Sequence, residues 1–406
     1  MTERSWPIVK LGHTARIGNG STPRRDSTIY WDDGDIPWLN SSVVNESRVT
    51  QAEQFVTAAA LRECHLPVVA PGSVLVGLTG QGKTRGMATI LEIEATINQH
   101  IAYVTPDRSR WLPGYLLWSL RAVYDELRYL SEENGSTKGG LTCEALKQFR
   151  LTLPPVKYQR AICDYLDRET ARIDTLIEEQ QRLIEVLRER RVSAIAAEFA
   201  ETATTPLRQV IEYAQTGPFG TQLTADEYVD NGVPVINPTH IQRGRIVPDD
   251  SITVTPEKAE DLARYRLAAG DIVLGRKGEV DKSALVDGQS AGYVCGSDAM
   301  ALRPAAGTVP DYLWWFLQSA EAHSQLEFWS VGATVSGLNQ TTIRKVRLPL
   351  PGEQEQRRIA RYLYEKTAKI DALIGETLQF IGLSQERRSA LITAAVTGQI
   401  DVRETA

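Results

Sequence analysis

Residues 159–177 read QRAICDYLDRETARIDTLI, and residues 356–374 read QRRIARYLYEKTAKIDALI. The second stretch follows the first at an offset of 197 residues (356 minus 159), and the two agree at most apolar positions. In both stretches the apolar residues recur at spacings of three and four, which is the pattern of a helix with one buried stripe. The sequence therefore predicts the same helix twice.

The duplication extends outward from these helices along the chain. The same offset aligns Ile36–Asn40 with Val233–Asn237, and Pro113–Leu120 with Pro310–Leu317. A period this long is far above the roughly 20–50 residues of solenoid repeats. We therefore expect a duplicated domain plus a duplicated helix, related by a pseudo-two-fold axis. A protein built in this way should recognise two copies of some binding target.

The predicted fold class is α+β, with two mixed α/β domains that are each followed by a long helix. The expected segments are a first domain at 1–155, its helix at 156–202, a second domain at 203–352 and its helix at 353–406. Short apolar runs bounded by Gly, Pro and Asp predict strands at Val68–Val69, Ser73–Gly77 and Asp271–Gly275. Prolines suited to a first helical turn predict helices at Pro113–Leu130 and Pro310–Trp329.

The two long helices should pack on each other. We expect them at Tyr158–Ala200 and Glu353–Val396; about forty residues at about 1.5 Å each span about 60 Å. Neither helix can bury its apolar stripe alone, so we expect an antiparallel coiled coil. The alternative is that each helix folds back onto its own domain. The residues expected to serve helix pairing or partner docking are Ile162, Leu166, Ile173, Leu176, Ile177, Ile359, Leu363, Ile370, Leu373 and Ile374.

Composition places the chain among ordinary soluble proteins. It has 406 residues, of which 42% are hydrophobic and 24% charged, with a net charge of −6. This charge argues only mildly against nucleic-acid binding, because basic residues also occur in local pairs. The four cysteines lack CxxC spacing, which predicts neither a zinc site nor a disulfide framework. No signal-peptide pattern and no apolar run of roughly 18 residues is found, so we expect a reduced, cytoplasmic protein without membrane contact.

One stretch, Gly77–Thr84 (GLTGQGKT), matches the P-loop pattern GxxxxGK[ST]. A P-loop requires a helix directly after the motif, because the helix amides hold the phosphates. The following residues, Arg85–Ile90, include a glycine and β-branched side chains and predict another strand. We therefore interpret the motif as a strand-to-strand turn that exposes Lys83, and nucleotide binding is the less favoured alternative.

Patterns for catalysis are missing from the sequence. No lysine has an acidic residue two positions before it, so the D/E-x-K pattern of metal-dependent nucleases is absent. Asn237–His240 (NPTH) is the nearest match to the Asn/Asp-Pro-Pro-aromatic motif of adenine methyltransferases and does not fit it. The five histidines stand apart from one another and predict neither a metal site nor a proton relay. We interpret the chain as non-catalytic.

The same motif leads into each long helix. It consists of Leu-Pro, then Gln, Ile, Leu and an Ile-Asp pair. Its carriers are Leu153-Pro154, Gln159, Ile162, Leu166 and Ile173-Asp174 in the first copy and Leu350-Pro351, Gln356, Ile359, Leu363 and Ile370-Asp371 in the second. A duplicated mixed domain with this helix entry resembles the specificity subunit of type I restriction–modification systems, and the resemblance covers the whole chain.

The resemblance implies a function in a prokaryotic, cytoplasmic complex. The two domains would be target recognition domains that each read one half of a bipartite site in double-stranded DNA. The helices would form the spacer and dock methyltransferase subunits, with two copies expected, and restriction/motor subunits would join them. No cofactor is implied for this chain, because S-adenosylmethionine, ATP and Mg2+ would bind the partner subunits. A non-catalytic protein-binding scaffold with the same pseudo-symmetry is the competing interpretation.

DNA bases are read mainly by Arg, Lys, Asn and Gln. The candidates for DNA binding are Arg24, Arg25, Lys83, Arg85, Asn98 and Gln99 in the first domain and Arg276, Lys277 and Lys282 in the second. For any one of these residues a solvated surface side chain is the competing interpretation, since most protein–DNA contacts go to phosphate.

Overall fold

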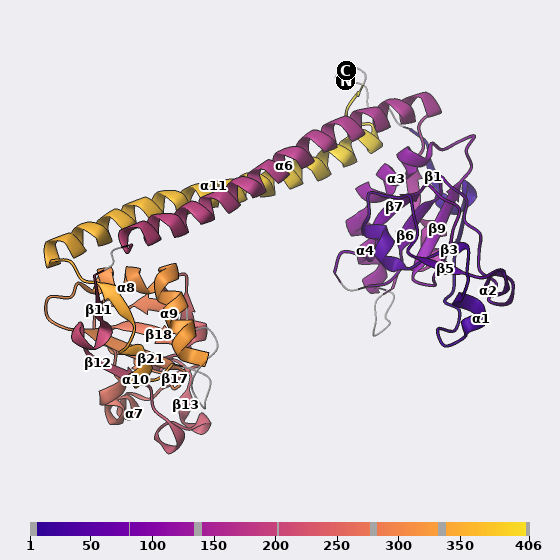
Figure 1. The fold of residues 1–406 in the computed structure, drawn as a ribbon. Helices are drawn as coiled ribbons and strands as arrows, with labels where there is room; N and C mark the ends of the chain where they lie inside the picture. The colour runs from indigo at the N-terminus through magenta and orange to yellow at the C-terminus, as the bar shows by residue number, and fades with distance from the viewer. Residues whose placement is uncertain are drawn as a thin grey trace. The chain divides into compact units, whose positions relative to one another are not determined.

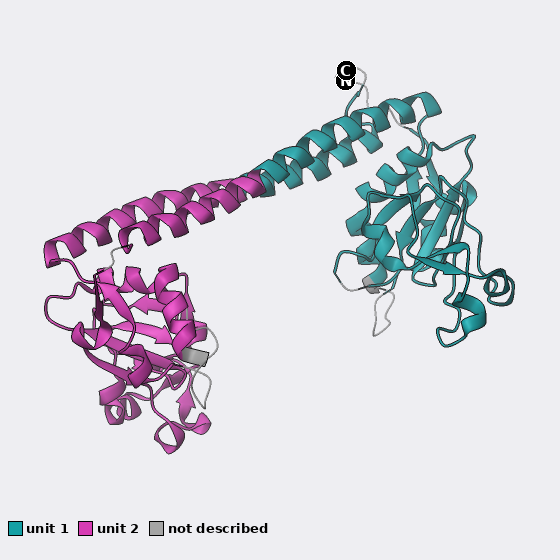
Figure 2. Cartoon of the chain, viewed as in Figure 1, with its two compact units in different colours: residues 1–179, 379–406 teal, residues 180–378 magenta. Residues whose placement is uncertain are grey.

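The computed structural model describes residues 6–80, 82–133, 140–200, 203–276, 282–331 and 338–402. It divides into two compact units, residues 1–179 with 379–406 and residues 180–378 (Figure 2). The border between the units falls inside both long helices. Each unit therefore contains one globular domain and a part of each helix.

The first domain is built on a five-stranded sheet (Figure 1). Its strand order is β2 (Ala15–Asn19), β9 (Ile101–Pro106), β6 (Val74–Gly77), β7 (Ala88–Leu91) and β4 (Arg48–Val49). A second sheet has the order β5 (Gln54–Val56), β3 (Ile36–Leu39) and β8 (Thr96–Ile97), and β1 (Ile8–Lys10) pairs with β10 (Arg150–Thr152). The helices are α1 (Thr28–Trp31), α2 (Ala58–Glu63), α3 (Pro113–Ala122), α4 (Tyr124–Glu133) and α5 (Cys143–Gln148), with the short 3-10 helices η1 (Leu11–His13) and η2 (Ser41–Asn45).

The second domain repeats this topology. Its first sheet has the order β12 (Ile211–Thr216), β21 (Ala299–Pro304), β18 (Ile272–Gly275) and β19 (Ser283–Leu285); its second has β13 (Tyr228–Val229), β17 (Thr253–Val254), β14 (Val233–Ile236) and β20 (Val294–Cys295). The remaining strands pair as β11 (Thr204–Pro206) with β22 (Arg347–Pro349) and β15 (Ile241–Gln242) with β16 (Arg245–Ile246). The helices are α7 (Pro256–Asp261), α8 (Pro310–Leu317), α9 (Ala320–Val331) and α10 (Gln340–Ile343). In both domains one inner strand, β3 or β14, has an antiparallel neighbour, β5 or β17, and a parallel neighbour, β8 or β20, so the predicted duplication of a mixed domain is confirmed.

Two local predictions were wrong. Each domain helix expected as one element is two: α3 ends at Ala122 and α4 begins at Tyr124, while α8 ends at Leu317 and α9 begins at Ala320. In the second copy the Ser319 hydroxyl accepts a hydrogen bond from the Ala322 N–H at 3.1 Å and so caps a new helix. The strand expected at Val68–Val69 is an isolated bridge from Val69 to Ala95.

The core of the first domain includes the end of the chain. Helix α3 contributes Tyr115 and Leu116, both fully buried, against the inner face of the five-stranded sheet. Ile392, Val396 and Val402 belong to the same apolar cluster, and the Tyr115 hydroxyl donates to the Val396 carbonyl at 2.9 Å. The first domain is therefore complete only when the C-terminal part of the last helix packs on it.

Helix α6 (Val156–Glu198) and helix α11 (Glu353–Thr397) pair antiparallel within each unit. In the first unit Arg388 binds Asp174, with Nε to Oδ1 at 2.8 Å, and in the second Arg191 Nε lies 3.2 Å from Asp371 Oδ1. Asp371 lies 197 residues after Asp174, and Arg388 lies 197 residues after Arg191. The duplication therefore relates the two ion pairs to each other. The predicted packing of the two helices is confirmed.

The apolar helix residues divide into two groups. Ile162 and Leu166 belong to the core of the first domain, and Ile359 and Leu363 belong to the core of the second. Of the other residues expected to pair the helices, Ile173 and Ile370 are buried, and Ile177 and Ile374 are half-buried. Leu176 is 44% exposed and its equivalent Leu373 is 49% exposed, so these two lie outside the buried seam.

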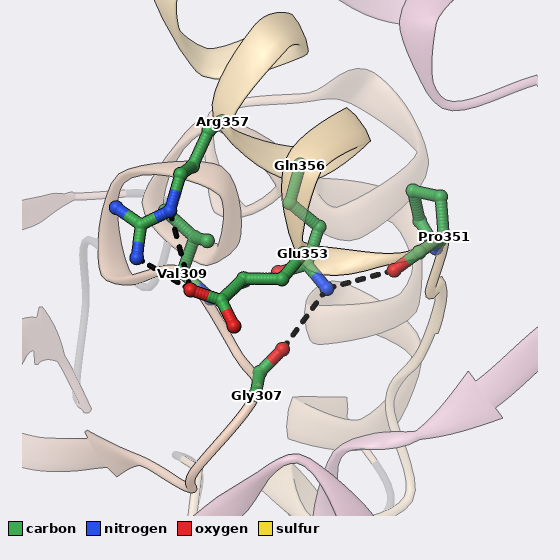
Figure 3. A network of polar contacts seen from close by, with 6 residues as sticks. All are labelled: Gly307, Val309, Pro351, Glu353, Gln356 and Arg357. Atoms are coloured by element: carbon green, nitrogen blue, oxygen red, sulfur yellow. Dashed lines mark hydrogen bonds and ion pairs between the residues drawn. The ribbon is translucent and has the colours of Figure 1, made fainter.

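A buried glutamine joins each domain to the start of its long helix (Figure 3). The Gln356 amide nitrogen donates to the carbonyls of Gly307 at 3.2 Å and Pro351 at 2.8 Å, while its oxygen accepts from the Val309 N–H at 2.8 Å. Gln159 makes the same three contacts in the first domain, to Arg110, Pro154 and Leu112 at 2.7–2.8 Å. Each side chain therefore binds three main-chain groups, two of them just before the domain helix α3 or α8 and one just before the long helix.

Replacing Gln356 by methionine should destabilise the second unit by about 2–4 kcal/mol, because the buried main-chain groups lose their partners while the side-chain volume is kept. Urea unfolding of the full chain, followed by circular dichroism, measures this change. Gln354→Met is the matched control, since Gln354 lies on the same helix turn and is exposed. Equal midpoints for the two variants would show that the glutamine contacts contribute nothing.

Candidate nucleic-acid interface

Three loops of the first domain meet at one edge of its five-stranded sheet. The register pairs Asn19 with Ala102 and Gly77 with Ile101, so β2 and β6 end where β9 begins. The loops 20–27, 78–87 and 98–100 leave from this edge, which we call the loop edge of the first domain. All six DNA-binding candidates of this domain lie on these loops, although they are far apart in the sequence.

A chain of polar side chains links these loops. The Thr22 hydroxyl donates to the Gln99 side-chain oxygen at 2.7 Å, and the Gln99 nitrogen lies 3.2 Å from His100 Nε2. His100 Nδ1 is in turn 2.8 Å from the Thr79 hydroxyl. Gln99 and His100 are both exposed, so the chain presents donors and acceptors to solvent in a fixed order. Of these four residues, only Gln99 was selected from the sequence. Thr22 and Thr79 lie close to Gly20 and Gly80, and His100 follows Gln99 directly.

The two neighbouring arginines differ in their surroundings. Arg25 lies over the rings of Trp31 and Trp38, at 4.2 and 4.7 Å from the ring centroids, and donates to Gln54 at 2.9 Å. These contacts fix Arg25 on its own domain. Arg24 is paired with Asp26 at 3.0 Å in solvent, a weak pair that DNA phosphate can replace. Arg24 is therefore the better candidate for a DNA contact.

The P-loop-like stretch forms a hairpin loop. Strand β6 ends at Gly77 and pairs antiparallel with β7, which begins at Ala88, so a strand and no helix follows the motif. This overturns the nucleotide-binding alternative, because the phosphate-holding helix amides are missing at this place. Lys83 is exposed as expected and Arg85 is half-buried. Gln81 lies outside the described residues.

Asn98 is 5% exposed and is used inside the turn. Its side-chain oxygen accepts from the His100 N–H at 2.9 Å. This contact is an Asx turn, which orients the exposed residues that follow. Asn98 therefore orients Gln99 and His100 within the turn.

The second domain has the corresponding loop edge, with different side chains. Arg276 lies at the end of β18, and its guanidinium donates to the carbonyls of Leu338 at 3.0 Å and Ser297 at 3.3 Å and lies over the Phe219 ring. These contacts join three loops, so Arg276 is held by the domain. Lys282 is half-buried and begins the next strand segment, and Lys277 lies outside the described residues.

A cavity of about 510 Å3 lies in the first unit between η2, the start of β7, the α3–α4 junction and α11. Its walls carry Arg121 and Arg388 together with Glu46 and Asp125. Burial, with the nearby charge of Arg388, lowers the pKa of Arg121. The lining charges balance, so the cavity favours neither anions nor cations.

The described ranges of the chain contain neither a membrane-spanning helix nor a group of metal ligands. None of the helices in those ranges is both long enough and apolar enough to cross a membrane. No group of three or more His, Cys, Asp or Glu side chains in those ranges is arranged to hold a metal ion.

The sequence profile of the type I restriction modification DNA specificity domain matches residues 3–187 and 202–379. Among curated proteins, the chain is 20% identical to the EcoR124I/EcoR124II specificity subunit of Escherichia coli over 43% of this chain and 44% of the relative. It is 27% identical to the MjaIX specificity subunit of Methanocaldococcus jannaschii over 45% of this chain and 41% of that protein. The chain thus spans less than half the length of the curated relatives it matches.

Solved structures match over nearly the whole chain. A chain from a structure of the type I R-M system, described in terms of complex assembly and conformational transition, has a TM-score of 0.79 at 16% identity, covering 98% of this chain and 99% of the other. The HsdS subunit of Thermoanaerobacter tengcongensis has a TM-score of 0.59 at 16% identity, covering 98% of both chains. At this identity the likeness establishes the fold.

Proposed function

The chain belongs to the family of type I restriction modification DNA specificity domains, and from this premise we propose that it is the DNA specificity subunit of such a system. Each globular domain binds one half of a bipartite site in double-stranded DNA. The observation that carries the proposal is the pair of loop edges: the same strand ends support different exposed and half-buried side chains in the two domains. Equal scaffolds with unequal loops suit two different half-sites.

The residues proposed to contact DNA follow from their exposure. Lys83, Gln99 and Arg24 are exposed on the first loop edge, and a Gln side chain can pair with adenine in the major groove. Lys282 and Lys277 are proposed for the second loop edge. Arg85, Asn98 and Arg276 are proposed to support the loops, since each is half-buried or buried within its domain. Arg25 is proposed to do the same, because it is held over Trp31 and Trp38 although it is exposed.

Apolar side chains exposed on the helices support docking of two methyltransferase subunits. Leu176 and Leu373 are equivalent by the 197-residue offset, and so are Leu183 and Phe380, which are 42% and 44% exposed. A protein that binds over Leu176 and Leu183 on one helix would find equivalent apolar side chains, Leu373 and Phe380, on the other helix. Exposed apolar side chains that recur on a surface favour a protein interface.

The remaining partners and cofactors are proposed from the family. Restriction/motor subunits join the complex for cleavage, and the chain itself contributes recognition without catalysis. S-adenosylmethionine belongs to the methyltransferase subunits, and ATP and Mg2+ belong to the motor subunits. The complex is proposed to work in the prokaryotic cytoplasm.

Sequencing of methylated adenines, with and without this gene, tests the proposal. We expect a motif of two short sequences and a fixed gap that disappears when the gene is deleted. A protein-binding scaffold predicts an unchanged pattern of methylated adenines.

Binding measurements provide the second test. Lys83→Ala in the reconstituted complex should lower the slope of log affinity against log salt by about one, as loss of one phosphate contact requires. Lys10→Ala removes the same charge on β1, outside the loop edge, and should leave the slope unchanged. A scaffold protein predicts no log-linear dependence of DNA binding on salt for any variant.

A further inference from the structure

We propose that Tyr124 and Arg128 of α4 hold residues 82–84 in the β6–β7 loop of the first domain, so that these residues bind one phosphate of the DNA backbone. The proposal rests on the proposed function and identifies how one contact is built. Both residues are positioning residues, because they act through the loop and do not touch the DNA themselves.

Side chains from outside the loop hold three successive loop residues. The Tyr124 hydroxyl donates to the Lys83 carbonyl at 3.0 Å, and Arg128 Nη1 donates to the Gly82 carbonyl. From η2, Asn45 donates to the Thr84 hydroxyl at 3.3 Å. The centre of the loop is therefore fixed on two sides by groups that belong to helical elements.

The two α4 side chains form one unit. Arg128 Nη1 also donates to the Tyr124 hydroxyl at 3.0 Å, and its guanidinium lies 5.6 Å from the Tyr124 ring centroid. A hydroxyl that accepts from a cation becomes a stronger donor, so the Tyr124 bond to the Lys83 carbonyl is reinforced. Substituting either residue should therefore release the loop.

The loop needs this support because glycine weakens it. Gly80, Gly82 and Gly86 all have positive φ, at 129°, 75° and 83°, which is the region that glycine enters most readily. A loop with three such residues would sample many conformations without outside contacts. Contacts from α4 and η2 select one of them.

The selected conformation presents hydrogen-bond donors away from α4. In a trans peptide the C=O and N–H groups point in opposite directions, so carbonyls directed at α4 turn the N–H groups of Lys83 and Thr84 away from it. Neither N–H donates to a main-chain or side-chain acceptor in the described part of the chain. With the exposed Lys83 ammonium they form a set of donors suited to phosphate oxygens.

The described part of the second domain does not repeat the Tyr124–Arg128 pair. The positions equivalent to Tyr124 and Arg128 are Glu321 and Gln325 (each 197 residues later). Gln325 instead accepts from the Arg347 N–H at 2.8 Å and donates to the Arg347 carbonyl at 2.9 Å on β22. The phosphate contact is therefore proposed for the first domain alone.

Binding of the reconstituted methyltransferase complex to two duplexes tests the proposal, one carrying the methylated motif and one of unrelated sequence. Tyr124→Phe removes a single hydroxyl and should weaken binding to both duplexes about five-fold, with an unchanged melting temperature and an unchanged motif. Arg128→Lys keeps the charge but loses the two-point contact and should weaken binding similarly. Tyr124→Phe combined with Lys83→Ala should weaken binding by less than the product of the single effects, because both act on one contact.

Tyr265→Phe is the matched control. It removes a hydroxyl that is bonded to Gln222 at 2.8 Å in the second domain and should bind both duplexes as the unaltered protein does. If Lys83→Ala weakens binding while Tyr124→Phe and Arg128→Lys do not, the positioning role is refuted and the proposed function stands. A change of methylated motif in Tyr124→Phe would also refute the phosphate contact, since it would indicate base reading. If no methylated motif depends on the gene at all, the proposed function itself fails.

Discussion

Inserting seven residues into each long helix, after Leu183 and after Phe380, should give a methylated site with the same two half-sequences and a longer gap. Seven residues at about 1.5 Å add about 10 Å to each helix, which corresponds to about three base pairs at about 3.4 Å per pair. A heptad also keeps the apolar stripe in phase. Because the duplex turns by about a tenth of a revolution per base pair, total methylation should fall unless the DNA twists to fit.

The structure explains why both helices must be lengthened. Each helix begins in one unit and ends in the other. An insertion after Leu183 alone would leave the Asp174–Arg388 pair or the Arg191–Asp371 pair out of register. This single insertion is the control and is expected to abolish methylation. Sequencing of methylated adenines in cells that carry each variant decides the matter. Full methylation of the original site by the double insertion, with its gap unchanged, would refute the view that the helices set the spacing.

Exchanging residues 1–155 for the same region of a relative should change one half of the methylated sequence completely and leave the other half intact. The loop edge of the first domain lies entirely within these residues, and its strands pair only with one another in the described structure. The exchange ends before Val156, where α6 begins. Methylated-base sequencing reads out both halves in one measurement.

The reciprocal exchange of residues 203–352 is the matched control and should change only the other half. In the exchange of residues 1–155, the donor domain must keep its contacts with α11, since Tyr115 bonds to the Val396 carbonyl and Ile392 lies in the same core. A hybrid in which both half-sequences change would contradict independent recognition by the two domains.

The long helices were predictable from the sequence because their signal is local and repeated. A stripe of apolar residues at helical spacing, copied at one fixed offset, determines both the element and the symmetry. Gln159 and Gln356 were visible as repeated residues, yet their function was hidden, because one of the two carbonyls that each binds, such as that of Arg110, lies more than forty residues earlier. Repetition indicates that a residue matters, and only the fold shows what it contacts.

The DNA-binding candidates were harder to rank because exposure depends on tertiary packing. The sequence gives no reason to prefer Arg24 or its neighbour Arg25 as a DNA contact. In the structure, however, two tryptophans hold only Arg25. Asn98 and Gln99 are also neighbours, and one is buried in a turn while the other is exposed. Tyr124 and Arg128 gave no signal, because a helix residue that holds a distant loop looks like any other surface residue.

The assignment of the last helix turns to the first unit has a consequence for synthesis on the ribosome. Residues 180–378 form a continuous segment and can fold while the rest is still being translated. The first domain emerges earlier but lacks Ile392, Val396 and Val402 until residues 392–402 are translated. At about 5–20 residues per second it waits for more than ten seconds with apolar surface open to solvent. In a nascent chain truncated at residue 378, we therefore expect the first domain to bind chaperones and to be cut by proteases, while residues 180–378 are already folded.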